Sequence, residues 1–429
     1  MRDAVAFEEP SVGAMSKSGL SRNDLVARDA VDPLAPAREG FDLPPGLIYL
    51  DGNSLGALPR ATAARVGETI EIEWGAGLVR SWNTHDWIAA PARVGAKIAP
   101  LVGAAAHEVI VADSTSVNLF KLVCGALGLR PDRRVILTEP GNFPTDLYVL
   151  QGIAGLLGSR VELRLVPRAE LAGAIDEETA AVVLTHVHYK TAERWPMAEI
   201  TARAHAKGAL AVWDLSHSAG ALAIDLGAVG ADLALGCGYK YLNGGPGAPS
   251  FVFVAERWQE ALASPLSGWM GHAAPFEFVD DYRPAPGVRR QLCGTPGILG
   301  LAALEAGVDA FAGVEMAALE GKGLALGDAF IDLVEARCEL ANLTLASPRE
   351  AARRGSHVSF RHPDGYAIMQ ALIARGVIGD FRAPDILRFG LTPLYLRFAD
   401  VWDAVETLRD VLASGDYRQP RFARRATVT

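Results

Sequence analysis

Cysteine is scarce in this chain of 429 residues: Cys124, Cys237, Cys293 and Cys338 are the only four, and they are widely scattered. No two of them have the spacing of a metal-binding pair, so the sequence predicts no metal site and no disulfide framework. A reduced, cytoplasmic protein is expected. Long apolar runs are also lacking. No stretch is long enough and free enough of charge to cross a bilayer, so no membrane contact is expected.

An excess of positive charge is absent as well. The chain has 41 basic and 50 acidic residues, a formal net charge of -9, which argues against a nucleic-acid partner. The acidic N-terminus contains no apolar core of signal-peptide length. A short solvated tail explains the basic residues near the end of the chain, which are Arg418, Arg421, Arg424 and Arg425.

What the chain does contain is an alternation of short apolar runs and helical patterns. Half of the residues are hydrophobic, enough for a large core. Several runs are apolar at successive positions, which is typical of strands that are covered on both faces. The pattern predicts an α/β protein with a mainly parallel sheet. The expected strands are 135–137, 161–166, 181–184, 210–213, 233–235 and 251–254.

The pattern changes after about residue 305 to long helices, at 301–312 and 316–335, followed by a shorter α+β region and a closing helix. We therefore expect a large domain over 61–305 and a small domain over 306–429. Residues 21–60 are expected to pack with the small domain. Residues 1–20 are expected to be a flexible extension, in which Met15 is an alternative start.

The most informative motif is the segment Gly238–Gly247, in which Lys240 stands between Tyr239 and Tyr241 before a run of Gly and Pro. A buried lysine loses its proton easily and then attacks carbonyls. Glycines let the backbone come close to a ligand. This combination indicates a lysine that holds pyridoxal phosphate as a Schiff base. The alternative is a surface lysine before a hairpin turn.

Asp214 and His217 follow directly on the expected strand 210–213. Ligands of open α/β sheets bind at the carboxyl ends of strands. A carboxylate there can pair with the pyridine nitrogen of the cofactor and favour the protonated ring. The alternative for Asp214 is a residue that caps a turn, and His217 has either a ring contact or a local structural role.

Two further segments suit the same cofactor. Asp113–Leu119 opens an amphipathic helix in which Ser114 or Thr115 is the N-cap, and such a helix start can bind a phosphate, although an ordinary cap is the alternative. In the loop 139–146, Phe143 could stack on a flat ring and Asp146 could accept a hydrogen bond; their alternatives are core packing and a helix cap.

Glycine-bounded segments around Trp269 and Thr295 complete the motifs, and pyridoxal-phosphate sites of this layout often borrow such residues from a second subunit. Packing is the alternative for the tryptophan. Arg388 lies in an apolar strand and needs an anion. That anion is either a structural carboxylate or the carboxylate of a substrate.

In their order along the chain, these segments resemble kynureninase, a fold-type-I pyridoxal-phosphate enzyme similar to class V. The resemblance runs from about residue 20 to the last helix. The Lys240 and Asp214 motifs suit many fold-type-I enzymes, whereas the motifs at 268–272 and 387–395 narrow the resemblance to kynureninase. The motifs are 51–56 (DGNSLG), 143–146 (FPTD), 214–220 (DLSHSAG), 239–247 (YKYLNGGPG), 268–272 (GWMGH) and 387–395 (LRFGLTPLY).

The resemblance implies a seven-stranded sheet and a homodimer with its active site at the subunit interface. It implies that Lys240 binds the cofactor and takes part in catalysis with Tyr239 and Asp214. It also implies that Arg388 and His85 contact the substrate. The residues implied to bind the cofactor are Thr115, Ser116, Phe143, Pro144, Thr145, Asp146, Thr185, Asp214, His217, Tyr239, Lys240, Trp269 and Thr295. Of these, Trp269 and Thr295 would come from the partner subunit.

The implied reaction is hydrolysis of L-kynurenine to anthranilate and L-alanine in tryptophan catabolism. Some relatives have Asn where Thr295 stands, so a preference for 3-hydroxykynurenine stays open. The alternatives are an aminotransferase, a cysteine desulfurase or a catalytically idle homologue. A desulfurase needs a nucleophilic cysteine on a mobile loop, whereas Cys338 falls in an expected helix (330–340) and Cys237 and Cys293 belong to the cofactor segments.

Overall fold

The computed structural model describes residues 19–338 and 342–425. The expectations for the N-terminal extension, including Met15, lie outside these residues except at positions 19 and 20. None of the helices within the described ranges has the length and apolar character that a membrane crossing needs.

A seven-stranded sheet forms the centre of the molecule, with strands in the order β2, β8, β7, β6, β5, β3, β4. Six strands run in one direction, and β8 is antiparallel to both of its neighbours. The predicted mainly parallel, seven-stranded sheet is therefore confirmed. The strands are β2 (Val109–Ala112), β3 (Val135–Thr138), β4 (Glu162–Leu165), β5 (Thr179–Thr185), β6 (Leu210–Asp214), β7 (Leu233–Gly236) and β8 (Ser250–Val254).

Both faces of the sheet are buried, because successive side chains of a strand point to opposite sides. Ile136 of β3 packs with α5 (Thr115–Leu129) and α6 (Pro144–Leu157) on one face. Its neighbour Leu137 belongs to the core on the other face. That second face is covered by α4 (Ala90–Ile98), α8 (Met197–Ala206) and α10 (Ile298–Asp309).

The helix α8 shows how local sequence sets an element's limits. Pro196 occupies the N-cap and Lys207 the C-cap. Gly208 follows with a φ of +74°, a conformation that glycine adopts without strain. The helix with its C-cap therefore ends directly before a glycine.

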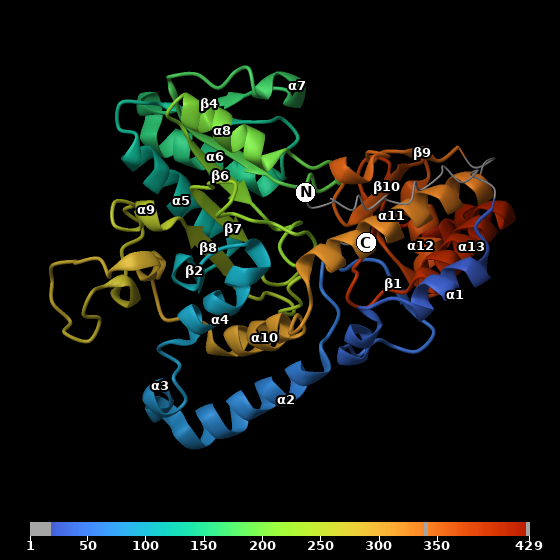
Figure 1. Cartoon of the computed structure of the whole chain (residues 1–429), viewed down its shortest axis with the longest axis horizontal. Coiled ribbons are helices and arrows are strands. Elements are labelled where there is room, and N and C mark those ends of the chain that lie inside the picture. Colours follow the sequence, from blue (N-terminus) through green and yellow to red (C-terminus); the bar gives the residue numbers. More distant parts are fainter. Residues whose placement is uncertain (1–18, 339–341, 426–429) are drawn as a thin grey trace, which may run out of the picture.

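The C-terminal part has a four-stranded sheet in the order β12, β13, β10, β9, packed against helices (Figure 1). Its strands are β9 (Thr344–Leu345), β10 (His357–Arg361), β12 (Asp380–Arg382) and β13 (Ile386–Gly390). Its helices are α11 (Met316–Arg337), α12 (Gly365–Ile373), α13 (Phe398–Ser414) and α14 (Pro420–Ala423). The expected helix over 330–340 is wrong at its end, because α11 stops at Arg337 and Cys338 is its C-cap.

The N-terminal segment lies beside this C-terminal part, as the blue and red elements of Figure 1 show. β1 (Ile48–Tyr49) pairs in parallel with β11 (Val377–Ile378). In α1 (Arg22–Ala30), the Arg22 Nε atom lies 2.8 Å from Asp403 Oδ1 of α13. The DGNSLG motif lies between the two sheets, because the Ser54 hydroxyl donates to Asp380 Oδ2 of β12 at 2.7 Å and the N–H of Gly56 donates to the backbone oxygen of Tyr239 at 2.8 Å.

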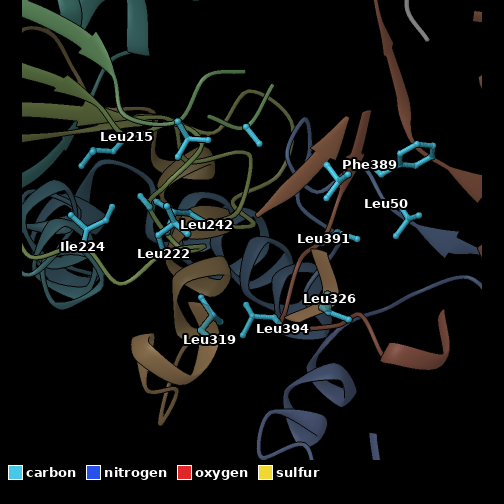
Figure 2. Close-up of a cluster of buried hydrophobic side chains, with 14 of the residues drawn as sticks. Leu50, Leu215, Leu222, Ile224, Leu242, Leu319, Leu326, Phe389, Leu391 and Leu394 are labelled. Atoms are coloured by element: carbon cyan, nitrogen blue, oxygen red, sulfur yellow. The ribbon is translucent and has the colours of Figure 1, made fainter. Parts of the chain in front are cut away.

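Buried aliphatic side chains join the large sheet to the C-terminal part. Figure 2 shows Leu215, Leu222 and Leu242, from the loops beyond β6 and β7, in one cluster with Leu319 and Leu326 of α11. These loops carry the site motifs, so a continuous hydrophobic core fixes the position of the motifs.

The sequence did not predict several elements between residues 50 and 112. Among them are β2, the helices α2 (Arg60–Glu68), α3 (Ser81–Thr84) and α4, and a π-helical stretch over Thr69–Gly77. Three further short helices are α7 (Arg168–Leu171), α9 (Glu256–Gln259) and the 3-10 turn Trp269–Gly271. The segment with α2 and α3 extends along the outside of the molecule, below the sheet in Figure 1.

Candidate active site

The ends of four neighbouring strands bring most of the predicted site residues together. Thr185 ends β5 and Asp214 ends β6. The loop with Phe143 follows β3, and the Lys240 turn follows β7. Since β7, β6, β5 and β3 are adjacent in the sheet, their carboxyl-end loops meet at one edge, as the rule for open α/β sheets predicts.

Lys240 is buried at this edge, with only 8% of the residue exposed. Its Nζ atom lies 3.0 Å from Nε2 of His217. The same atom is 5.6 Å from the ring centre of Phe143 and 5.9 Å from that of Tyr239. The alternative of a surface lysine is wrong, because the amine is enclosed by aromatic rings and an imidazole.

Two buried carboxyl groups, of Asp146 and Asp214, face each other beside this lysine. Asp214 Oδ1 accepts a hydrogen bond of 2.7 Å from the N–H of Ser216, and Asp146 Oδ2 lies 3.1 Å from Thr185 Oγ1. Burial, and then the negative charge of Asp214, raise the pKa of Asp146 well above its usual value. A pair of this kind is stabilised by a shared proton or by an added N–H cation.

A protonated pyridine nitrogen is such a cation, so the residues present fit pyridoxal phosphate. Phe143 presents its ring to the lysine amine and has Tyr189 packed edge-on against it, with ring centres 5.2 Å apart. Pro144 and Thr145 form the first turn of α6 behind it. The pyridine ring of the cofactor would then have the Phe143 ring on one face and the carboxyl groups of Asp146 and Asp214 at its edge.

The buried ring of His217 lies next to a second buried imidazole, with its centre 5.4 Å from that of His357. Within residues 19–338 and 342–425, His217 Nδ1 and both nitrogens of His357 have no hydrogen-bond partner. Burial lowers the pKa of both rings well below the usual value. The positive charges of Lys240, for His217, and of Arg388, for His357, act in the same direction. Both rings are thus neutral at pH 7.

The start of α5 carries the features expected of an anion site. Ser114 is the N-cap, and its Oγ atom accepts a hydrogen bond of 3.4 Å from the N–H of Val117. Thr115 and Ser116 lie in the first turn, where backbone N–H groups have no partner within the helix. Thr295 and Ser114 both line a cavity of about 440 Å³.

The structure does not bring Trp269 and His85 to the lysine. Trp269 is 37% exposed and packs with Phe276 and Phe278, at ring-centre distances of 5.6 and 6.2 Å. His85 is the C-cap of α3, at the outer end of the segment below the sheet (Figure 1). Among the described residues, neither side chain forms a hydrogen bond or a ring contact with Lys240 or with the residues around it, which are Phe143, Asp146, Asp214, His217 and Tyr239.

Arg388 is buried in β13 and forms the ion pair that the sequence left open. Its Nε atom donates to Asp380 Oδ1 at 2.8 Å, and its Nη1 atom donates to the backbone oxygen of Tyr189 at 2.6 Å. Asp380 is its partner residue on the antiparallel neighbour β12. The ring of Tyr189 packs on Phe143, and Phe143 lies next to the amine of Lys240. Arg388 is therefore linked to Lys240 through Tyr189 and Phe143.

Sequence reasoning missed several residues of this region. The side chain of Asn142 accepts a hydrogen bond of 2.5 Å from Thr185, and its position next to Phe143 was a usable signal. Asp380 precedes Arg388 by eight residues, and only the antiparallel register makes them partners. Tyr189 carries no motif that would have identified it.

Residues 319–408 match the family model described as the kynureninase C-terminal domain. A kynureninase from Burkholderia mallei (strain SAVP1) is 55% identical over 414 residues, covering 95% of this chain and 100% of that protein. A kynureninase from Pseudomonas fluorescens is 53% identical over 414 residues, with the same coverage. Identity of this extent along nearly the whole chain shows common descent.

Solved structures with low sequence identity share the fold. The apo cysteine desulfurase of Thermococcus onnurineus NA1 aligns with a TM-score of 0.74 at 19% identity, covering 89% of this chain and 98% of that one. The cysteine desulfurase CsdA of Escherichia coli aligns with a TM-score of 0.74 at 17% identity, covering 90% and 99%. A lysine-to-alanine mutant of C-DES, with glycine covalently linked to its PLP cofactor, aligns at 0.74 and 19% identity, covering 87% and 99%.

Proposed function

The chain belongs to the kynureninase family, and from this premise we propose that it hydrolyses L-kynurenine to anthranilate and L-alanine with pyridoxal 5'-phosphate as its cofactor. Relatives named kynureninase match it over 95% of its length. The solved C-DES structure of the same fold has a PLP cofactor.

The observation that carries this proposal is a buried group of three residues: Lys240 and Asp214, which lie beyond the ends of neighbouring strands, and Asp146 in the first turn of α6. Bound pyridoxal phosphate supplies a carbonyl carbon that amines can attack and a pyridine ring that accepts electrons. Lys240 would hold that carbonyl carbon, Asp214 would bind the proton of the ring nitrogen, and Phe143 would stack on the ring. The first turn of α5, with Thr115 and Ser116, would hold the phosphate.

The side chains around Lys240 can perform the proton transfers of the reaction. With the cofactor and the substrate in place, the free amine of Lys240 would be the base that takes the proton from the substrate Cα. Neutral His217, 3.0 Å away, can hold a hydrogen bond to that amine. Tyr239 has its pKa raised, chiefly by burial, so it keeps its proton at neutral pH and can serve as a donor. Arg388 would bind the substrate carboxylate.

A desulfurase needs a nucleophilic thiol. None of the four cysteines, all of which lie in the described residues, has the lowered pKa of such a thiol. A reactive thiol has a lowered pKa. Burial raises the pKa of Cys124 and of Cys338 to about 11. Burial also raises the pKa of Cys237 and of Cys293. The desulfurase neighbours therefore share the fold and not the thiol chemistry.

Several finer assignments remain part of this proposal. We propose a cytoplasmic homodimer whose active site takes Trp269 and Thr295 from the partner subunit, with His85 near the aromatic part of the substrate. The exposed aromatic group of Trp269, Phe276 and Phe278 supports such a contact. We also propose a large domain over 61–305 and a small one over 306–429, with 21–60 packed on the latter.

The test is the release of fluorescent anthranilate from L-kynurenine, with 3-hydroxykynurenine measured in parallel. Lys240→Ala should abolish both turnover and the visible absorbance of the bound cofactor. Lys207→Ala is the matched control, because Lys207 is an exposed lysine at the C-cap of α8 that pairs with Glu177 at 2.8 Å. Turnover of kynurenine by the Lys240 variant would exclude the assigned role.

A further inference from the structure

The guanidinium group of Arg388 has little capacity left for a ligand. An arginine has five N–H donors. The Nε donor and one Nη2 donor bind the two oxygens of Asp380. Nη2 also donates to Ser54 Oγ at 2.7 Å, and Nη1 donates to the oxygen of Tyr189 at 2.6 Å. One N–H, on Nη1, remains, so Arg388 alone cannot bind a carboxylate through two parallel bonds.

Arg382, two residues beyond Asp380 on β12, has the donors that Arg388 lacks. Its Nη2 atom lies 2.6 Å from Asp380 Oδ2 and donates to Ser54 Oγ at 3.2 Å. Its Nε and Nη1 atoms form no hydrogen bond with any residue in the described ranges. The Arg382 side chain is 36% exposed, against 2% for Arg388, so three N–H groups of Arg382 are available.

Arg382 lies on the same face of β12 as Asp380, because the two residues are two positions apart, and Asp380 is the partner of Arg388 across the ladder. The positive charges of Arg382 and Arg388 both act on His217, which contacts Lys240. The positive charge of Arg382 is also felt by Tyr189, whose ring packs on Phe143. A substrate carboxylate next to the lysine would therefore meet Arg382 together with the last donor of Arg388.

The charge of the cluster suits one additional anion. Arg382 and Arg388 face the carboxyl groups of Asp380 and Asp51, so the ionised cluster has two charges of each sign. Asp51 Oδ1 is buried without a partner among the described residues. Burial, and then the charge of Asp380, raise the pKa of Asp51 to about 7. With this proton in place the cluster carries one net positive charge.

We propose that Arg382 is a second residue that binds the carboxylate of the amino-acid substrate, through its Nε and Nη1 groups, beside Nη1 of Arg388. This inference rests on the proposed function, because it assumes an amino-acid substrate at Lys240. Arg382 lies in β12, outside all of the motifs that the sequence offered. Asp380 then holds both guanidinium groups in position.

The test uses Arg382→Gln and Arg382→Lys, with Arg361→Gln as the matched control. Arg361 is an arginine of the same sheet, 47% exposed in its side chain, which pairs with Asp385 at 3.0 Å. A lost hydrogen bond to a charged group corresponds to a KM for L-kynurenine that is about 10-fold to 100-fold higher in Arg382→Gln. The value of kcat should change less than about threefold, because the lost bond is present in ground state and transition state alike.

Two further measurements identify the carboxylate as the contact. The amine that corresponds to kynurenine without its carboxylate, used as an inhibitor, should keep its inhibition constant in Arg382→Gln. Binding of L-alanine, followed by the absorbance of the bound cofactor, should weaken about as much as KM rises. Arg382→Lys should recover part of the affinity, since it keeps the charge but not the planar group.

The proposal is overturned if Arg382→Gln binds L-alanine as tightly as the unchanged protein, or if the amine without carboxylate loses the same affinity. A variant that fails to fold would show altered circular dichroism, and Arg382→Lys then decides. Absence of anthranilate release by the unchanged protein would refute the proposed function, whereas the L-alanine titration would still measure the role of Arg382.

Discussion

We expect Asp51→Asn to stabilise the protein at pH 8 relative to its effect at pH 5. Asp51 follows β1 in the segment between the two sheets, and its Oδ1 atom has no hydrogen-bond partner in the described residues. Burial, and then the charge of Asp380, raise its pKa from 3.8 to about 7, although Arg388 and Arg382 act in the opposite direction. Asparagine keeps the shape of this side chain and removes the titration.

The sign follows from proton binding in the two states. Between about pH 4 and pH 7 the folded protein holds a proton that the unfolded chain has released, so its free energy of unfolding falls as the pH rises. A pKa raised from 3.8 to about 7 corresponds to about 4 kcal/mol over the full pH range. Between pH 5 and pH 8 the expected loss is about 2 to 3 kcal/mol, and this is an upper value because Asp51 keeps some contact with solvent.

The assay is urea unfolding followed by circular dichroism at pH 5, 6, 7 and 8, at constant salt. The free energy of unfolding of Asp51→Asn, minus that of the unchanged protein, should increase steadily with pH. Asp42→Asn, which removes an exposed carboxylate from the same segment, is the control for the loss of a charge. A flat or falling difference for Asp51→Asn would refute the reasoning.

Two further substitutions test the packing around the site. In Gly56→Ala, the added methyl group would overlap the backbone oxygen of Lys240, so we expect at least tenfold less turnover and weaker cofactor absorbance; unchanged values would mean that the two segments separate freely. In Trp213→Ala, removal of a side chain that is 1% exposed and bonded to Thr201 at 3.1 Å should lower the free energy of unfolding by about 3 to 5 kcal/mol in a urea titration. A loss below about 1 kcal/mol would show that the core refills this space.

The central sheet was predictable because its strands are apolar at successive positions, a signal that the side chains themselves carry. β5 is buried at all of its seven residues and β6 at all five. By contrast, β2 has four residues and no distinctive flanking signal, since a short apolar run fits a strand or a buried helix equally well. The π-helical turns over Thr69–Gly77 have no recognisable sequence pattern.

The candidate site divides along the same line. Lys240 and Asp214 stand in recognisable motifs directly after strands, so their common edge followed from the α/β alternation alone. Asp146 was placed in a loop at that edge, but its closeness to Asp214 and its raised pKa depend on how α6 packs. Arg388 was correctly expected to need an anion, and the identity of that anion came only from the structure.

The amino-acid sequence by itself determined the α/β fold, the motif order and the lysine at the end of a strand, because each depends on residues that are neighbours along the chain. The tertiary structure decided which charges share a buried space. Arg388 meets Asp380 through strand register, and both meet Ser54 from a segment more than 300 residues away. Such pairings depend on long-range closure of the chain, which no local pattern encodes.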